Sequence, residues 1–360
     1  MTVRAALLTE IGAPLRLVDL ELPPPGPGQV RVQVAATGVC HSDYSLARGT
    51  LRQQVPAVLG HETAGVVAEL GAGVTSVAVG DRVVLVWAAP CRECWFCAAG
   101  EPWLCERSSN PAGTPYATVD GQAVYPGLST GGFATETVVS ERAVLPVPDE
   151  VPLEQAALVG CAVMTGIGAV LDTARVQPGQ TVLVVGLGGV GLSVVQGARL
   201  AQAARVIVVD RSPEKLALAQ QLGATDVLEA GGELAKQVRG LTDGRGADHA
   251  FDCVGLAETI RSCWSATRRG GTTVVVGIGG KEQQVTFTAL ELFHFARTLK
   301  GCVYGGADPS VLMPRILAHA AAGEVDLSAL ISGTIGLADI DAAFADMEQG
   351  LGARAVVVPA

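Results

Sequence analysis

Four cysteines lie within fifteen residues of this 360-residue chain, and they constrain its fold more than any other feature. They are Cys91, Cys94, Cys97 and Cys105. Four thiolates at spacings of three, three and eight residues can close a tetrahedral shell around Zn²⁺ and leave no open position for a substrate. The cluster therefore predicts a structural zinc lobe over residues 91–105.

A second, sparser set of metal-binding residue types is spread over the first half of the chain. It comprises Cys40, His61 with Glu62, and Cys161. A mixed set of cysteine and histidine, with one position left for water or substrate, is typical of catalytic zinc sites. The sequence thus indicates two zinc ions per chain, one structural and one catalytic.

Length and composition narrow the class of protein. A chain of 360 residues is long enough for two domains with separate cores. The net charge of −10 argues against a nucleic-acid or anionic-membrane partner, because either would favour a basic face. The first residues lack the long apolar core of a secretory signal, and five glycines in the uncharged run 181–198 argue against a membrane helix. We therefore expect a cytoplasmic protein whose cysteines bind metal or pack in the interior.

The pattern of apolar residues changes near residue 163. Before it, short strands and turns prevail, as in the alternation of Val30, Val32 and Val34. After it, apolar strands are predicted at 181–185, 206–209, 226–228, 249–253, 273–277 and 301–303, with helices such as 213–222 and 233–241 between them. Six strands with helical crossovers are typical of a doubly wound parallel sheet that binds dinucleotides. The closing strand 355–358 is predicted to pair with the first domain.

A glycine-rich turn follows the strand 181–185 directly and precedes a stretch compatible with a helix. The first glycine, Gly186, permits a tight turn, Gly188 lets the backbone approach a pyrophosphate, and Gly191 allows close packing of helix on strand. Gly189 and Val190 complete the turn, and the start of the helix would face the phosphates. The context of strand, turn and helix makes this a predicted dinucleotide site.

An acidic residue at the end of the next strand indicates which dinucleotide binds. Asp210 lies nineteen residues after Gly191, where a carboxylate can bind both ribose hydroxyls of NAD and repel the 2′-phosphate of NADP. Arg211 next to it can partly neutralise that charge. The sequence therefore predicts NAD as the cofactor and leaves the strictness of this preference open.

These elements in this order resemble the zinc-dependent alcohol dehydrogenases of the medium-chain dehydrogenase/reductase superfamily, over essentially the whole chain. The matching segments are GVCHSD at 38–43, GHE at 60–62, the four-cysteine lobe, GC at 160–161 and the glycine turn. The segment 161–169 is similar to the branch that includes thiol-dependent formaldehyde dehydrogenases. The resemblance implies a GroES-like, β-rich catalytic domain over 1–162, a Rossmann domain over 163–303, and a return to the catalytic domain over 304–360.

Carried over residue by residue, the resemblance assigns the metal ligands of the catalytic site. Cys40, His61 and Cys161 would hold the zinc, which would act as a Lewis acid on the alcohol. Glu62 would lie near the metal, with transient binding to it as an open alternative. Asp43 would accept the free N–H of His61 and fix its tautomer.

The resemblance also implies residues that contact substrate and coenzyme. Ser42 would pass the alcohol proton outward, and His41 and Arg354 would contact the coenzyme phosphates. Trp87 would narrow the substrate pocket, although a core tryptophan is the competing interpretation. Some relatives have a histidine at the position of Ser45, so the group that completes the proton relay stays open.

The resulting expectation is an NAD-dependent zinc alcohol dehydrogenase that interconverts small alcohols with aldehydes or ketones. The alternative within the enzyme class is a formaldehyde dehydrogenase acting on an S-hydroxymethyl thiol adduct. This substrate needs a charged anchor, and the sequence does not single one out among Arg48, Arg52 and Arg107. A catalytically silent dinucleotide-binding sensor is a further alternative, but it would usually lack the catalytic zinc ligands. A zinc-lobe protein for nucleic acid is opposed by the acidic charge. A homodimer is expected, with a tetramer as the alternative.

Overall fold

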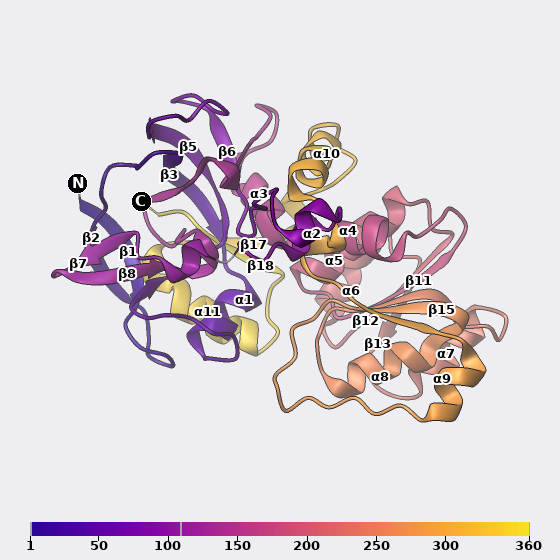
Figure 1. Ribbon diagram of the computed structural model, residues 1–360. Helices are drawn as coiled ribbons and strands as arrows, with labels where there is room; N and C mark the ends of the chain where they lie inside the picture. The colour runs from indigo at the N-terminus through magenta and orange to yellow at the C-terminus, as the bar shows by residue number, and fades with distance from the viewer. Residues whose placement is uncertain (1, 109, 360) are drawn as a thin grey trace. The chain divides into compact units, whose positions relative to one another are not determined.

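The computed structural model describes residues 2–108 and 110–359 and divides the chain into two units (Figure 1). The first unit runs to Ala162 and resumes at Asp308, and the second comprises Val163–Ala307. The boundary predicted from the sequence, between residues 303 and 304, lies four residues before the one between Ala307 and Asp308. The turn Tyr304–Gly306 stays with the second unit because the hydroxyl of Thr173 donates to the carbonyl of Gly305 at 3.0 Å.

The first unit is rich in short strands, as the alternating pattern predicts. One set forms a closed barrel in the order β1 (Thr2–Leu8), β2 (Arg16–Glu21), β7 (Ala117–Val119), β8 (Gln122–Pro126) and β4 (Ala57–Val58). A seven-stranded sheet has the order β10 (Val144–Pro146), β6 (Arg82–Leu85), β5 (Glu62–Leu70), β3 (Gln29–Gly38), β18 (Arg354–Val357) and β17 (Ile331–Ile335), with β9 (Glu136–Ser140) also paired to β3. The helices of the first unit are α1 (His41–Ala47), α2 (Trp95–Ala98), α3 (Leu153–Leu158), α10 (Pro309–Ala321) and α11 (Ile340–Glu348).

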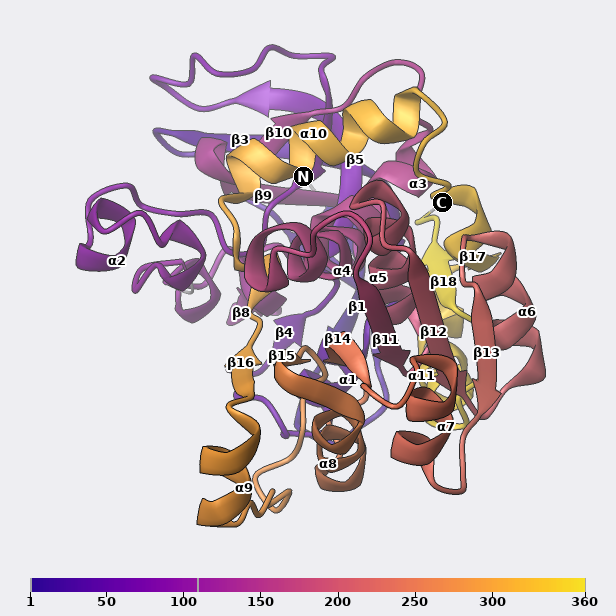
Figure 2. The same cartoon turned by 90° about the vertical axis from the view of Figure 1, so that its right-hand side faces the viewer.

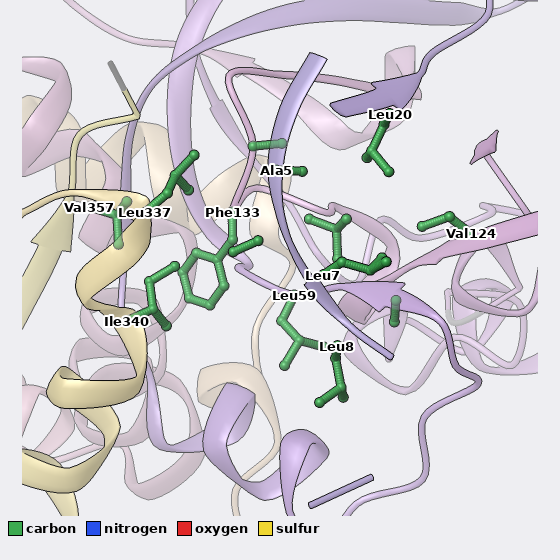
Figure 3. Packing of buried hydrophobic residues seen from close by; sticks show 14 of the residues in the cluster. Ala5, Leu7, Leu8, Leu20, Leu59, Val124, Phe133, Leu337, Ile340 and Val357 are labelled. Carbon is green, nitrogen blue, oxygen red and sulfur yellow. The ribbon is translucent and has the colours of Figure 1, made fainter. Parts of the chain in front are cut away.

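The end of the chain packs into the core of this first unit. β18 pairs antiparallel with β3, which confirms the predicted closing strand. Figure 3 shows Leu337, Ile340 and Val357 beside Phe133, and all four side chains are buried in one apolar cluster. Because aromatic residues are few in this chain, the cluster is built mainly from leucine, valine and alanine. This apolar cluster of the first unit is therefore made from two separate stretches of sequence.

The second unit contains the predicted parallel sheet. Its six strands have the order β13 (Asp226–Glu229), β12 (Arg205–Asp210), β11 (Thr181–Val185), β14 (Ala247–Asp252), β15 (Thr267–Val275) and β16 (Thr298–Gly301). Figure 2 shows β11, β12 and β13 side by side. Its helices are α4 (Met164–Gly168), α5 (Gly189–Leu200), α6 (Pro213–Gln221), α7 (Leu234–Leu241), α8 (Ala257–Ala266) and α9 (Ala289–Phe295). In Figure 1, α7 and α8 lie on one side of the strands and α5 on the other, as in a doubly wound fold.

The strand order reverses between β11 and β14. All pairings are parallel, and Val185 at the end of β11 pairs with Asp252 at the end of β14. In open α/β sheets, ligands bind beyond the carboxyl ends of the strands at such a switch point. The glycine turn follows Val185 directly, so it occupies this position.

Two strand predictions need correction. The fifth strand begins at Thr267, earlier than the predicted 273, and the last is Thr298–Gly301 and not 301–303. Every residue of β16 is exposed at the edge of the sheet. An edge strand without a buried face lacks the apolar run on which the prediction relied.

A long apolar helical run connects the two parts of the chain. Leu153–Ala174 is long and apolar enough to cross a membrane by length and composition, but 78% of its most apolar window is buried within the fold. Such burial is typical of the core helix of a globular protein. The run 181–198, by contrast, divides into β11 and the start of α5.

Candidate active site

The four-cysteine lobe brings its thiols together. The Sγ atoms of the four cysteines all lie within 4.8 Å of one another. The main chain also turns toward the sulfur atoms, since the N–H groups of Glu93 and Cys94 donate to Sγ of Cys91 at 3.4 and 3.3 Å. The bond from Glu93 is the main reason why the pKa of Cys91 is lowered to about 6. The main chain therefore favours the thiolate form of Cys91, which is the form that zinc requires.

Two arginines anchor this lobe to the rest of the first unit. Arg142 donates from Nη1 to the carbonyl of Cys91 at 3.2 Å. Arg92 binds both carboxylate oxygens of Asp308, with 2.9 Å from Nη2 to Oδ1, and also the hydroxyl of Ser310. Asp308 caps the start of α10. Arg92 thus links the lobe to Asp308, the residue at which the chain returns to the first unit.

The second set of metal-ligand types also converges. Ligand atoms of Cys40, His61, Glu62 and Cys161 all lie within 4.8 Å of one another, and all four residues are buried. Cys40 caps the start of α1, Glu62 opens β5 directly after His61, and Cys161 lies in a π-helical turn after α3. The hydrogen bond with Cys161 and the charges of Arg354 and His61 lower the pKa of Cys40 well below its usual value.

Asp43 holds one ring nitrogen of His61. Its Oδ1 atom lies 2.9 Å from Nδ1 of His61 and accepts the N–H of Gly60 at 2.9 Å. The other ring nitrogen, Nε2, is buried and makes no hydrogen bond to any of the described residues. A histidine held at one nitrogen by a carboxylate, with the other nitrogen directed at two thiols, fits a zinc ligand. The residues present therefore fit the metal that the sequence analysis expects.

Glu62 is fully buried beside these ligands. Its Oε2 atom lies 3.4 Å from Nε of Arg354, whose side chain is only 6% exposed and donates from Nη1 to the carbonyl of Val39 at 2.7 Å. Burial raises the pKa of Glu62 to about 8, although the charge of Arg354 opposes this. Glu62 and Arg354 thus lie within ion-pair distance of each other inside the first unit.

The remaining predicted residues of the first unit surround this set. The Ser42 hydroxyl lies 3.7 Å from Sγ of Cys40. Trp87 is half-buried, and its ring meets that of His61 edge-on with 6.4 Å between centroids. His41 is exposed at the start of α1 and contacts the ring of Tyr44. The structure therefore places Ser42 and Trp87 next to the candidate metal ligands and His41 at the surface.

The three glycines of the turn in the second unit differ in backbone conformation and in the space around them. Gly186 has a φ of +90°, which favours glycine, and a Cβ on Gly191 would collide with the carbonyl oxygen of Gly186. At Gly188, by contrast, no described atom lies within 4 Å of a built Cβ. Gly188 caps α5, whose first residues are Gly189 and Val190. The turn is thus closed on the side of the sheet and open at Gly188, where a phosphate can approach the helix N-terminus.

Asp210 lies at the end of β12, close to this turn. Its carboxylate accepts the N–H of Leu187 at 2.7 Å and that of Ser212 at 2.9 Å. Arg211 is exposed beside it. Asp210 is therefore oriented toward the glycine turn by its main-chain partners.

Comparisons with known proteins agree with this geometry. Residues 26–149 match the alcohol dehydrogenase GroES-like domain family, and residues 189–318 match the zinc-binding dehydrogenase family. An S-(hydroxymethyl)glutathione dehydrogenase from Synechocystis sp. is 39% identical over 99% of this chain and all of its own length. The chain belongs to the zinc-dependent alcohol dehydrogenases.

Solved structures of the same family share the fold of this dehydrogenase. Benzyl alcohol dehydrogenase from Acinetobacter calcoaceticus has a TM-score of 0.93 at 28% identity, with both chains fully covered. A zinc-binding dehydrogenase from Sinorhizobium meliloti bound to NADP has a TM-score of 0.85 at 26% identity, again with full coverage of both chains. These likenesses confirm the predicted GroES-like domain with a Rossmann domain.

Two features of the dehydrogenase site escape the sequence analysis. The contact of Glu62 with Arg354 joins two residues that lie far apart in the sequence. A buried glutamate without a nearby cation is costly, so the presence of a partner could have been inferred, but its identity could not. The π-helical turn around Cys161 has no local signature apart from Gly160.

Proposed function

We propose that this dehydrogenase oxidises small alcohols with NAD at a zinc ion held by Cys40, His61 and Cys161. The observation that carries the proposal is the buried Nε2 atom of His61, which is directed at the thiols while Asp43 holds Nδ1. Three ligands leave a fourth position open for the alcohol, which is the arrangement of catalytic zinc sites. The four cysteines of the lobe would hold a second, structural ion.

The residues around the open position have distinct tasks in this proposal. Zinc, when bound, supplies a Lewis acid that makes the alcohol more acidic. The hydroxyl of Ser42 takes the alcohol proton, since it lies close to Cys40 and on the surface side of the buried ligands. Trp87 forms an apolar wall beside His61 and favours small or primary alcohols. Asp43 keeps His61 in the tautomer with Nε2 free.

The coenzyme preference depends on the second unit. Support for NAD comes from the Asp210 carboxylate at the end of β12, which would bind the ribose hydroxyls and repel a 2′-phosphate. The Sinorhizobium meliloti relative is bound to NADP, so the family alone does not decide the preference. His41 and Arg354 remain our candidates for contacts with the coenzyme phosphates.

Replacing Asp210 by glycine is expected to relax the preference for NAD. Loss of the charged hydrogen-bond acceptor should reduce the ratio of kcat/KM for NAD to that for NADP by about 10- to 100-fold, because hydrogen bonds to charged groups contribute about 1.5–3 kcal/mol. Steady-state rates with both coenzymes give the ratio directly. Asp226→Gly, at an ion-paired position of the neighbouring strand, is the control. An unaltered ratio in Asp210→Gly would remove the assigned role.

The proposed reaction is tested by NADH formation with the zinc-loaded protein on primary, secondary and aromatic alcohols. Formaldehyde with a series of thiols is included, because the Synechocystis relative is named for an S-hydroxymethyl glutathione substrate. Turnover of free alcohols would support the proposal. Turnover only with a thiol adduct would favour the formaldehyde dehydrogenase alternative, and coenzyme binding without any turnover would favour a sensor.

A thiol adduct would need cationic groups for its carboxylates. Arg48 and Arg52 are exposed just after α1, and the guanidinium of Arg48 lies 5.3 Å from the ring centre of Tyr44. Arg107 already pairs with Glu93 in the zinc lobe. Arg48 and Arg52 are therefore the better candidates for this second substrate class.

We further propose a homodimer formed along the edge of the parallel sheet. β16 is exposed along its whole length, and α9 next to it carries Leu290 and Phe293 at 72% and 84% exposure. Exposed edge strands present unpaired main-chain groups, and a second copy related by a twofold axis can pair with them antiparallel. The apolar residues of both copies would then face each other. A tetramer would require another surface in addition.

Replacing Phe293 by glutamate is expected to weaken this dimer by about 30-fold or more, because aromatic anchors of interfaces contribute about 2 kcal/mol or more. Light scattering coupled to gel filtration over a range of concentrations measures the mass. Val79→Glu, at a 63% exposed position of the first unit, should leave the mass unchanged. Equal masses for wild type and Phe293→Glu at all concentrations would contradict this interface.

The proposed setting is the cytoplasm, where nine free cysteines stay reduced and available to metal. The net charge of −10 offers no electrostatic attraction to nucleic acid or to anionic lipid. The partners in this proposal are therefore the alcohol or aldehyde, the coenzyme and a second copy of the chain.

A further inference from the structure

The helix that carries Cys161 changes its hydrogen-bond pattern at this residue. α3 is followed by a π turn over Val159–Val163, α-helical geometry resumes over Met164–Gly168, and a second π turn covers Ala169–Ala174. π turns are rare, occur mostly as single turns inside α helices, and are frequent at functional sites. The turn therefore sets the direction in which the Cys161 side chain leaves the helix.

A hydrogen bond to Glu62 fastens this turn to the first unit's sheet. The main-chain N–H of Ala162 donates to Oε1 of Glu62 at 3.2 Å. In a regular α helix this N–H would bond the carbonyl of Leu158. The carboxylate of Glu62 is therefore a specific acceptor for a main-chain group of the residue directly after Cys161.

Close packing at Gly160 adds to this contact. A Cβ atom at Gly160 would lie 3.1 Å from the carbonyl oxygen of Leu85 and 3.4 Å from that of His61. The turn thus rests on the backbone of β6 and on the residue that supplies the imidazole ligand. The absence of a side chain at Gly160 is what permits this approach.

The opposite side of the Glu62 carboxylate is also fixed. Its Oε2 atom lies 3.4 Å from Nε of Arg354, and a Cβ atom on Gly38 would collide with Oε2. One carboxylate oxygen thus accepts the N–H of Ala162, and the other lies within ion-pair distance of Arg354 without a hydrogen bond among the described residues. Glu62 bridges the closing strand β18, which begins at Arg354, and the π turn.

We propose that Glu62 is a positioning residue that holds the π turn, through the N–H of Ala162, in the conformation that brings the Cys161 thiol to Cys40 and His61. Cys40 directly precedes α1 and His61 directly precedes β5, whereas Cys161 is the candidate ligand on the long helix. Without this tie, the turn can relax to α-helical geometry and rotate the thiol away. The proposal rests on the proposed function, in which Cys161 is a zinc ligand.

The test compares Glu62→Gln with Glu62→Met. Both side chains are uncharged and similar in size, but only glutamine keeps an oxygen acceptor for the N–H of Ala162. The readouts are the affinity of the zinc-free protein for Co²⁺, measured by competition with a chelator, and the thiolate-to-cobalt absorption per bound ion. Either variant leaves the buried charge of Arg354 without a carboxylate beside it. Both variants are therefore also made in an Arg354→Met background, which removes this buried cation.

Glu62→Met is expected to lower Co²⁺ affinity at the catalytic site by about 10- to 100-fold and to reduce the thiolate absorption, as loss of an outer partner of a ligand does. Glu62→Gln should stay within about threefold of wild type. The four-cysteine lobe should load fully in every variant and so report correct folding. Equal affinities and absorption for the two variants, whether both fall or neither does, would overturn the positioning role.

The same titration separates this proposal from the proposed function. Wild-type protein should bind two cobalt ions, and Cys161→Ser should weaken one of them. If wild type bound cobalt only at the lobe, the zinc site itself would be wrong, and the positioning role would fall with it. If Cys161→Ser weakened binding while Glu62→Met did not, only the positioning role would fail.

Discussion

Cys40→Ala is expected to reduce kcat/KM for alcohol oxidation by about 1000-fold or more, because a Lewis acid supplies several kcal/mol of transition-state stabilisation and each 1.4 kcal/mol is tenfold in rate. The variant removes one of the two thiols that face Nε2 of His61. Zinc content should fall by one ion per chain, and the lobe should keep its own. Initial rates together with metal analysis check both results.

Cys263→Ala is the matched control, since Cys263 is fully buried in the core of the second unit and belongs to neither metal set. Its activity should stay close to wild type. Retention of full activity by Cys40→Ala would show that this thiol does not hold the catalytic zinc, and the assignment of the site would have to be abandoned.

Cys97→Ala is expected to destabilise the protein with little direct effect on the chemistry. Structural zinc contributes folding free energy directly, about 10–16 kcal/mol in isolated zinc-finger peptides. The lobe is joined to a larger core here, so a loss of about 4 kcal/mol and a decrease in Tm of about 10 °C are expected. Thermal unfolding and zinc content measure the effect.

Cys40→Ala serves as the reciprocal control for this variant. Each substitution should remove one zinc ion, but only Cys97→Ala should produce the large decrease in Tm. Because Arg92 connects the lobe to Asp308, the segment from α10 onward should unfold together with the lobe. An unchanged Tm with both zinc ions retained would contradict a structural role for the four cysteines.

Features encoded by closely spaced residues could be predicted from the sequence. Consecutive cysteines of the lobe are at most eight positions apart, so their convergence requires only a compact loop. The glycine turn was predicted for the same reason, because strand, turn and helix follow one another without interruption. The central strands β11 and β12 are apolar on both faces, which makes them easy to locate.

Contacts between distant residues could not be derived in this way. The convergence of Cys40, His61 and Cys161 was expected only through the family resemblance, since spacing alone does not place them together. The pairing of Glu62 with Arg354 depends on β18 joining β3, and the sequence predicts that strand without its register. The π turn at Cys161 is accompanied by close packing of Gly160 against Leu85 and His61, which leaves no periodic pattern in the sequence.

The central claim is that this chain transfers hydride from an alcohol to NAD at the site of Cys40, His61 and Cys161. The most direct measurement is the mass of the reduced coenzyme after turnover of an alcohol deuterated at the carbinol carbon. The account predicts that one deuterium appears in NADH with the zinc-loaded wild type and that Cys40→Ala yields almost none. Coenzyme reduction without deuterium transfer, or equal transfer by both proteins, would contradict it.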